Sequence, residues 1–216
     1  IMVEPNDSRA VIRAAGDRAE DVQRVTGIKP TLAGDPSKGK FLIIAGTLGQ
    51  SPVVDRLVAA GKLDVAGVRG EWESYVLQIV KNPLPGVDAA LVISGSDRRG
   101  TIYGIYQLSE MIGVSPWSWW ADVPVKHRST LALQGDRLAQ GPPAVKYRGI
   151  FLNDEDWGLR PWAAKTFDPA TGNVGPKTYA KVFELLLRLH ANYLWPAMHP
   201  DTAAFNSFPE DSKLAD

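Results

Sequence analysis

Three consecutive carboxylates, Asp154, Glu155 and Asp156, follow an apolar run in the segment FLNDEDWG, residues 151–158. Like charges packed this closely repel one another, and a purely structural surface would spread them out. One interpretation is the floor of a catalytic pocket, where carboxylates transfer protons or hold hydroxyl groups. The other is a solvated turn in which Asn153 or Asp154 accepts local backbone hydrogen bonds. The spacing alone leaves both interpretations open.

A second pair of candidate side chains, Trp195 and His199, lies in the segment ANYLWPAMHP, residues 191–200. We expect this segment to be a strand with its exit loop, and YRGIFL, residues 147–152, to be the strand that precedes Asn153. In α/β barrels the side chains at the carboxyl ends of the strands carry the chemistry, because the loops there open into one mouth. The pattern therefore predicts that both strands deliver polar and aromatic groups to the same rim.

Glu110 is a third candidate, on a helix expected over residues 101–113. The apolar residues of that helix share one broad face, at Ile102, Ile105, Leu108 and Ile112. Tyr103, Tyr106 and Glu110 share the other face, and two phenols with one carboxylate suit a hydroxylated ligand. A solvated helix face explains the same spacing, so both interpretations remain.

Two glycine-containing turns, GTLGQS (46–51) and GSDRRGT (95–101), lead from predicted strands into predicted helices. Such turns can present backbone N–H groups to an anion. Neither matches a known phosphate-binding pattern, which favours plain tight turns. The three histidines, His127, His190 and His199, include no pair with metal-ligand spacing, so we expect neither a metal site nor a cofactor.

The elements that must position these residues alternate between helix and strand in the first half of the chain. Helices are expected over residues 7–27, 51–61 and 101–113, and strands over residues 40–47, 73–80 and 89–95. Ser51 is expected to cap the second helix, with Pro52 at its first position and Gly61 at its end. This order is typical of a small mixed α/β domain, which we place at residues 1–125.

Residues 126–145 are expected to be a linker, because the chain around them is rich in proline and has little helical periodicity. One short strand is expected there at STLAL, residues 129–133. The alternation then restarts with strand 147–152, a long loop to residue 176, helix 177–190 and strand 191–200. Since a TIM (β/α)8 barrel needs roughly 250 residues, we expect residues 146–216 to be the first two βα units of a truncated barrel. The predicted fold class is α/β.

Composition narrows the class of protein. The chain of 216 residues is 44% hydrophobic and 22% charged, which is ordinary for a globular protein. Its formal net charge of +0 excludes a general attraction to nucleic acid or to an anionic membrane. No apolar stretch approaches the roughly 20 residues that span a bilayer. Most of the seven tryptophans lie in the second half, where they suit sugar platforms or a core.

Four collinear segments of this sequence resemble glycoside hydrolase family 115, a family of xylan α-1,2-glucuronidases. They are IIAGTLGQSPVVDRLVAAGKLDV (43–65), residues 93–125, YRGIFLNDEDWGLRPWAAKTF (147–167) and residues 175–199. The resemblance covers about residues 5–210. The helix RGTIYGIYQLSE is also similar to the small α/β domain that precedes the barrel in other exo-acting glycosidases. The chain is therefore identified as resembling the N-terminal portion of a family 115 enzyme.

The resemblance implies an enzyme that removes glucuronic acid, or its 4-O-methyl form, from α-1,2-substituted glucuronoxylan or aldouronic oligosaccharides, with inversion. An inverting mechanism uses two carboxyl groups about 6.5–9.5 Å apart. Asn153, Asp154 and Glu110 match family positions at the pocket. We expect Asp154 to be catalytic, and the substrate-binding residues to be Asn153, Glu110, Glu155, Trp195 and His199.

Further expectations come with the same resemblance. The general acid and base are expected on strands beyond residue 216, so this fragment is expected to be inactive alone. The parent is expected to be secreted, to the periplasm or outside the cell, with homodimerisation left open. Two other hypotheses stay open: a non-catalytic carbohydrate-binding module that uses Glu110, Trp157 and Trp195, and an anion-binding domain built on the two glycine turns.

Overall fold

The computed structural model describes residues 1–33, 40–132, 135–152 and 157–216. The chain divides into two compact units, which we name unit 1, Ile1–Ala144, and unit 2, Val145–Asp216. Each unit has a hydrophobic core of its own. Together they give a mixed α/β fold, and no closed barrel is present in the described parts of the chain.

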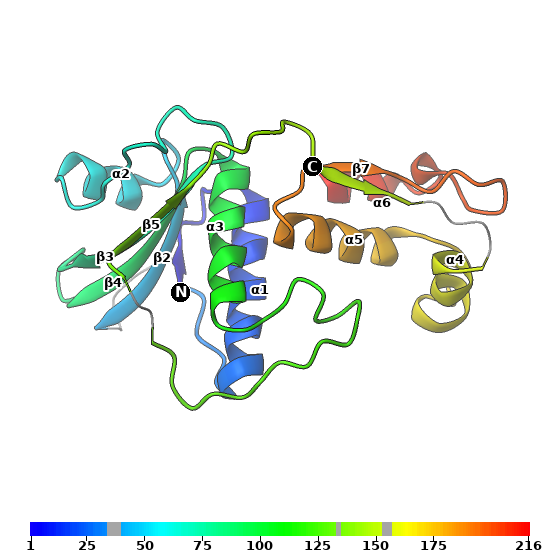
Figure 1. Ribbon diagram of the computed structural model, residues 1–216, viewed down its shortest axis with the longest axis horizontal. Coiled ribbons are helices and arrows are strands. Elements are labelled where there is room, and N and C mark those ends of the chain that lie inside the picture. The colour runs from blue at the N-terminus through cyan, green and yellow to red at the C-terminus, as the bar shows by residue number, and fades with distance from the viewer. Residues whose placement is uncertain (34–39, 133–134, 153–156) are drawn as a thin grey trace. The chain divides into compact units, whose positions relative to one another are not determined.

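Unit 1 is built on a five-stranded mixed sheet in the order β1-β2-β4-β3-β5. The strands are β1 (Met2–Val3), β2 (Phe41–Thr47), β3 (Tyr75–Lys81), β4 (Ala89–Gly95) and β5 (Arg137–Gln140). β1, β2 and β4 run parallel, and β3 lies antiparallel to both β4 and β5. Figure 1 shows this sheet edge-on beside its helices.

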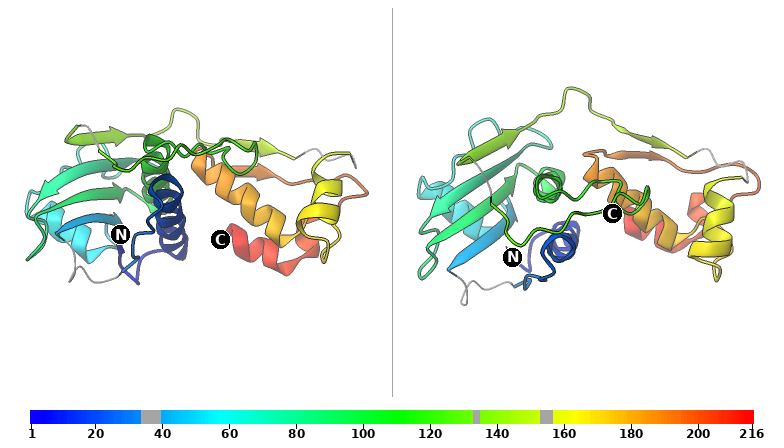
Figure 2. Two further views of the ribbon diagram at one scale, coloured as in Figure 1. Left: turned by 90° about the horizontal axis from the view of Figure 1, so that it is seen from below. Right: turned by 60° about the horizontal axis from the view of Figure 1, so that its bottom comes forward.

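Three helices cover the sheet: α1 (Arg9–Thr26), α2 (Pro52–Ala59) and α3 (Arg98–Met111). α1 and α3 pack against each other on one face, and α2 covers the opposite face (Figure 2). Val54 and Leu57 of α2 meet Ile44 and Val76 of the sheet in one buried cluster. The apolar face of each helix is therefore buried, as the helical spacing in the sequence predicts.

Side-chain and glycine caps set the helix boundaries. The Ser51 side chain accepts a hydrogen bond from the backbone N–H of Val54, and Pro52 opens α2. The Asp97 carboxylate accepts from the backbone N–H of Gly100 and caps α3. α1 ends at Gly27, whose φ of 78° suits glycine. The expected cap at Ser51 is confirmed.

The strand expected at STLAL is wrong. Residues 129–132 are not in a strand, and the edge of the sheet is formed instead by β5, at residues 137–140 of the segment expected to be a linker. β5 pairs with β3 so that Gln140 lies opposite Tyr75, and the Tyr75 hydroxyl donates a hydrogen bond of 2.7 Å to Gln140 Oε1. Pairing with a strand far away in the sequence outweighs local β propensity here.

Unit 2 contains a strand–helix–strand unit: β6 (Gly149–Phe151), α5 (Pro176–Arg188) and β7 (Tyr193–Trp195). β6 and β7 pair in parallel, as two strands joined by a crossover helix must. After β7 come a short 3-10 helix, η2 (Phe205–Ser207), and α6 (Pro209–Ala215). The expected strands and helix of this half are present.

The expected loop between β6 and α5 is in part helical. It contains α4 (Leu159–Trp162) and a π-helical turn, η1 (Ala163–Phe167). The cause is burial: Ala163 is fully buried, Leu159 and Trp162 pack against the same core, and the Trp162 and Phe167 rings stack with centroids 4.9 Å apart. The tryptophan at position 162 therefore belongs to the core.

Candidate functional site

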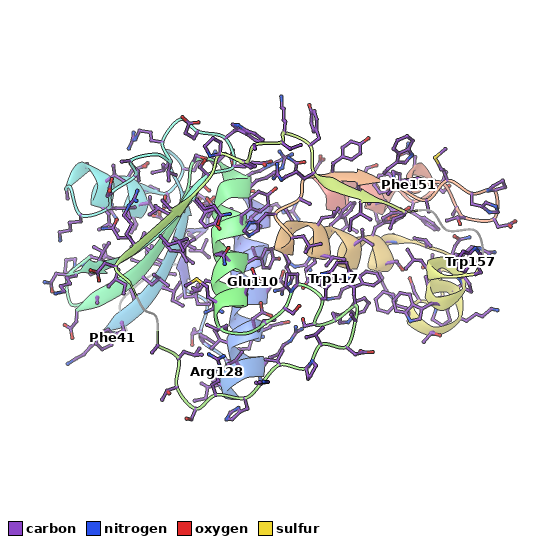
Figure 3. The ribbon with its side chains drawn as sticks, in the orientation of Figure 1. Phe41, Glu110, Trp117, Arg128, Phe151 and Trp157 are labelled. Carbon is purple, nitrogen blue, oxygen red and sulfur yellow. The ribbon has the colours of Figure 1, made fainter. Side chains whose placement is uncertain are left out.

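β6 and β7 end at the same position of their shared register. Ile150 lies opposite Leu194 and Phe151 opposite Trp195 in the parallel register. Because side chains alternate along a strand, Leu194 faces the core beneath α5, whereas Phe151 and Trp195 face the other side. Both are about half exposed, and their rings meet edge to face with centroids 5.4 Å apart. Figure 3 labels Phe151 at the end of β6.

The amino ends of the two strands hold this register. A Cβ atom at Gly149 would overlap the carbonyl oxygen of Tyr193, so only glycine permits the close approach. The Arg148 guanidinium donates to the His190 carbonyl oxygen from Nε at 2.9 Å and from Nη2 at 2.7 Å. Asn192 Oδ1 accepts from the Arg148 backbone N–H at 3.1 Å. These contacts fix the start of each strand and hence the level at which each one ends.

The exit of β7 brings Trp195 and His199 into one short segment. Trp195 Nε1 donates to Met198 Sδ at 3.1 Å. His199 Nδ1 accepts from the Asp201 backbone N–H at 3.4 Å and lies 3.6 Å from Asp201 Oδ2. Both contacts are made at Nδ1, so the imidazole can meet a ligand through Nε2. About a third of the His199 side chain is exposed.

The other predicted residues of this half lie outside the described part of the chain. Asn153, Asp154 and Glu155 fall in the gap between residues 152 and 157, directly after β6. Trp157, at the far side of that gap, is 81% exposed, which is the largest exposure among the large hydrophobic side chains of the described residues. The predictions for Asn153, Asp154 and Glu155 remain predictions.

Glu110 lies on α3 in unit 1, with its side chain exposed (Figure 3). The sequence left a ligand-binding face and a solvated face open here, and both interpretations are wrong for the two phenols, since Tyr103 and Tyr106 are buried. The Tyr106 hydroxyl donates to Asp17 Oδ2 on α1 at 2.7 Å, because α1 packs along this face of α3. Of the two phenols that the sequence places beside Glu110, Tyr106 therefore belongs to a helix–helix interface and Tyr103 to the buried interior of unit 1.

Glu110 lies near a polar cluster between α3 and the strands β3 and β5. The Tyr75 hydroxyl donates to Gln107 Oε1 at 3.1 Å as well as to Gln140. Burial raises the pKa of Tyr75, and the negative charge of Glu110 raises it further. Tyr75 is therefore a neutral hydrogen-bond donor at ordinary pH, and Glu110 is the solvent-facing carboxylate of this group.

The glycine turns after β2 and β4 are closed by the chain's own carboxylates. Helices leave these two strands toward opposite faces, an arrangement that creates a ligand crevice in many α/β sheets. Here Glu4 Oε2 accepts from the Val53 backbone N–H at 3.1 Å, at the start of α2. Asp7 accepts from the Thr47 backbone N–H at 2.9 Å, and Asp97 already caps α3. The backbone N–H groups that could bind an anion here already donate to the carboxylates of Glu4, Asp7 and Asp97.

The glycines of these turns serve close packing. A Cβ at Gly95 would overlap the Thr101 nitrogen, and a Cβ at Gly100 would overlap the Ser74 carbonyl oxygen. This geometry favours the plain tight turns over an anion site, as the missing phosphate patterns predict.

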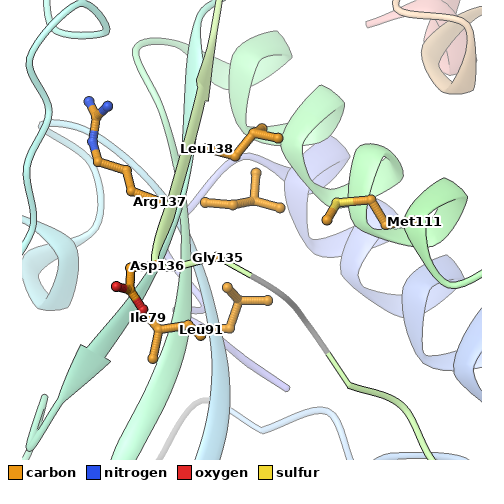
Figure 4. Close-up of a pocket in the computed structure, with 8 residues that line it drawn as sticks. Ile79, Leu91, Met111, Gly135, Asp136, Arg137 and Leu138 are labelled. Atoms are coloured by element: carbon orange, nitrogen blue, oxygen red, sulfur yellow. The ribbon is translucent and has the colours of Figure 1, made fainter.

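A cavity of about 120 Å³ opens in unit 1 beside the carboxyl end of α3 (Figure 4). Its lining is largely apolar, with Asp136 and Arg137 at one side: Leu77, Ile79, Leu91, Met111, Gly135, Asp136, Arg137 and Leu138. Ligand pockets for small molecules are usually about 300–1,000 Å³. The cavity is too small for a sugar and contains no predicted site residue.

Within the described ranges, no group of three or more His, Cys, Asp or Glu side chains could hold a metal ion. No helix among the same residues is long and apolar enough to cross a membrane. Sequence reasoning missed two residues near the ends of the paired strands: Phe151, the last residue of β6, and Asp201, in the loop after β7. Strict alternation along β6 could have found Phe151, because it lies between two residues that face the core. No local pattern marks Asp201.

Comparisons with known proteins find similarity to one glycoside hydrolase family over part of the chain. Residues 140–216 match the model of glycosyl hydrolase family 115. A solved family 115 4-O-methyl-α-glucuronidase, BtGH115A, described as specific for decorated arabinogalactans, is 37% identical, with a TM-score of 0.85. The match covers 99% of this chain and 27% of BtGH115A.

A second solved structure, CpGH84D, matches 93% of this chain and 27% of its own at 13% identity, with a TM-score of 0.48, and carries no conclusion. No curated protein matches the sequence.

Proposed function

The chain carries a glycosyl hydrolase family 115 region, and we propose that it is part of an α-glucuronidase that releases glucuronic acid or its 4-O-methyl form from a branched glycan. The observation that carries the proposal is the similarity to BtGH115A along nearly all of this chain. Because the chain spans only 27% of that relative, the activity is proposed for the full-length protein.

Two glycan classes are candidate substrates. The resemblance of the sequence to xylan α-1,2-glucuronidases favours α-1,2-substituted glucuronoxylan. The name of the solved relative favours decorated arabinogalactan. Both present a terminal uronic acid, so one pocket chemistry serves both, and the residues that contact the backbone of the glycan distinguish them.

The roles proposed for individual residues follow from their chemistry. Trp195 and Phe151 offer aromatic faces at the exits of β6 and β7, suited to packing against a sugar ring. His199 presents Nε2 to the uronic acid. Glu110, Asn153 and Glu155 are proposed to accept hydrogen bonds from its hydroxyls, and Asp154 is proposed to act on the reacting centre.

The mechanism we propose is inverting hydrolysis. One carboxylic acid protonates the leaving oxygen while a carboxylate on the far side activates water, and the two stand about 6.5–9.5 Å apart to admit that water. The acid needs a raised pKa and the base an ordinary one, so the two require different surroundings. Parallel pairing of β6 and β7 with α5 between them supports the further proposal that unit 2 begins a (β/α)8 barrel.

Release of uronic acid by the full-length protein tests the function. Glucuronoxylan and decorated arabinogalactan are offered separately, and the anomer first formed is identified by NMR, with inversion expected. An Asp154→Ala change should lower kcat/KM by at least about 100-fold, the usual contribution of a proton-transferring group. The control is Glu20→Ala, which removes an exposed carboxylate that pairs with Lys29 at 3.4 Å.

The outcomes separate the hypotheses. Binding of either glycan with no release of uronic acid would favour the non-catalytic carbohydrate-binding module. Release with full activity in Asp154→Ala would leave the enzyme proposal intact and refute the role of Asp154.

A further inference from the structure

The loop that precedes α5, residues 168–175, is held together by hydrogen bonds to Asp168, and we name it the platform. Asp168 is buried, with 3% of its surface exposed. Its Oδ2 accepts from the Thr171 hydroxyl at 2.6 Å, and its Oδ1 accepts from Lys177 Nζ at 3.0 Å. These hydrogen bonds hold the pKa of Asp168 below its usual range, so the carboxylate stays charged. The Asp168 carbonyl oxygen also accepts from the backbone N–H groups of Thr171 and Gly172.

Asn173 projects from this platform to the loop after β7. Its Oδ1 accepts from the backbone N–H of Val174 at 2.8 Å and from that of Ala203 at 3.0 Å. Its Nδ2 lies 3.5 Å from the Asp201 carbonyl oxygen, at the limit of a hydrogen bond. Val174 is fully buried, which fixes the backbone beside Asn173. One carboxamide therefore joins the loop after β6 to the loop after β7.

The residues that Asn173 holds are those that orient His199. The Thr202 backbone N–H donates to the His199 carbonyl oxygen at 2.8 Å, and Thr202 is buried. Asp201, whose carbonyl faces Asn173, meets His199 Nδ1 through its backbone N–H. Fixing the backbone at positions 201 and 203 thus fixes the turn that carries the imidazole.

We propose that Asn173 is a positioning residue: it clamps the turn from His199 to Ala203, so that His199 Nε2 is aimed at the glycan. Asn173 makes no contact with the substrate in this role and acts through His199. The inference rests on the proposed function, in which His199 binds the uronic acid.

A double-mutant cycle in the full-length protein tests the proposal. Asn173→Leu keeps the size of the side chain but removes the oxygen acceptor, and should lower kcat/KM by about tenfold, mainly through a higher KM. Asn173→Asp keeps the oxygen that accepts from Val174 and Ala203, and should stay within about threefold of the wild type. In a His199→Ala background, Asn173→Leu should cause no further loss, because both changes remove one interaction.

The control is Asn206→Leu, which alters an exposed asparagine of η2, three residues after Ala203. Histidine-labelled protein supplies a second readout, since Asn173→Leu should shift the His199 imidazole resonances and Asn206→Leu should not. An equal loss on Asn173→Leu with or without His199 would mean general destabilisation and overturn the proposal. Unchanged His199 resonances would overturn it whatever the activity.

The same variants distinguish a failure of the role proposed for Asn173 from a failure of the glycan-binding role proposed for His199. If His199→Ala lowers kcat/KM and Asn173→Leu does not, only the role of Asn173 is wrong. If His199→Ala has no effect in an active enzyme, the glycan-binding role of His199 is wrong, and the positioning role falls with it.

Discussion

At the scale of single residues, Asp211 in unit 2 is a buried carboxyl group whose surroundings shift its pKa. It lies on α6, is fully buried, and neither carboxylate oxygen has a hydrogen-bond partner among the described residues. Burial raises the pKa of Asp211 to about 6, and the negative charge of neighbouring Glu210 adds to the shift. Burial, together with the negative charge of Asp211, raises the pKa of Tyr179 on α5 to about 12. Folding therefore favours the protonated form of Asp211.

We predict that unit 2 loses stability as the pH rises. The folded-state pKa of Asp211 lies above that of an unfolded chain, so its contribution is complete at low pH and is lost as the pH passes through about 6. Thermal unfolding followed between about pH 4 and pH 8 should show a fall in Tm that Asp211→Asn removes. Glu210→Gln, a change at an exposed neighbour, should retain most of the fall. An identical pH profile in Asp211→Asn would refute the assignment.

At the scale of elements, the way in which strands enter helices depends on backbone contacts that exclude a Cβ atom. Gly100, in the first turn of α3, lies against the Ser74 backbone that leads into β3. Gly16, in the middle of α1, has open space where its Cβ would be. The two positions are both helical glycines, and only their packing differs.

The same substitution should therefore have opposite effects at the two glycines. Gly100→Ala should destabilise unit 1 by about 1–3 kcal/mol, because the methyl group must displace the Ser74 carbonyl. Gly16→Ala should stabilise it by about 0.5–1 kcal/mol, because alanine loses less conformational freedom in a helix. Chemical denaturation of the purified variants measures both. Equal effects at the two positions would contradict the packing argument.

At the scale of the whole molecule, the two units differ in how completely they cover their sheets. Unit 1 has helices on both faces of five strands. Unit 2 has two strands, and one face of them carries exposed aromatic side chains, at Phe151, Tyr193 and Trp195. A two-stranded sheet with one uncovered apolar face is marginal by itself.

We predict that residues 1–144, produced alone, unfold in one cooperative transition. Residues 145–216 alone should unfold without a sharp transition and should bind a hydrophobic dye. Calorimetry and dye fluorescence measure these properties. Cooperative unfolding of residues 145–216 without dye binding would show that their exposed aromatic face needs no further cover.

Much of the fold could be predicted, because the spacing of apolar residues within one helix or strand shows which of its faces is buried. The cap at Ser51, the apolar stripe of α5 and the strands on either side of it all follow from spacing within one element. What failed were assignments that depend on a distant partner. The sequence allows Tyr106 to be a ligand-binding phenol, but its hydroxyl is bonded to Asp17 of α1. β5 forms at residues 137–140 because it pairs there with β3, a strand far away in the sequence.

The sequence by itself determined which residues have an apolar face, where helices begin, and which strand ends carry aromatic and acidic groups. It also carried the resemblance to family 115. Only the tertiary structure decided which faces are covered, that the glycine turns are filled by Glu4, Asp7 and Asp97, and that Asn173 reaches the turn of His199. The physical reason is that apolar periodicity shows which face of a helix or strand must be buried. It does not show which other element, from elsewhere in the chain, packs against that face.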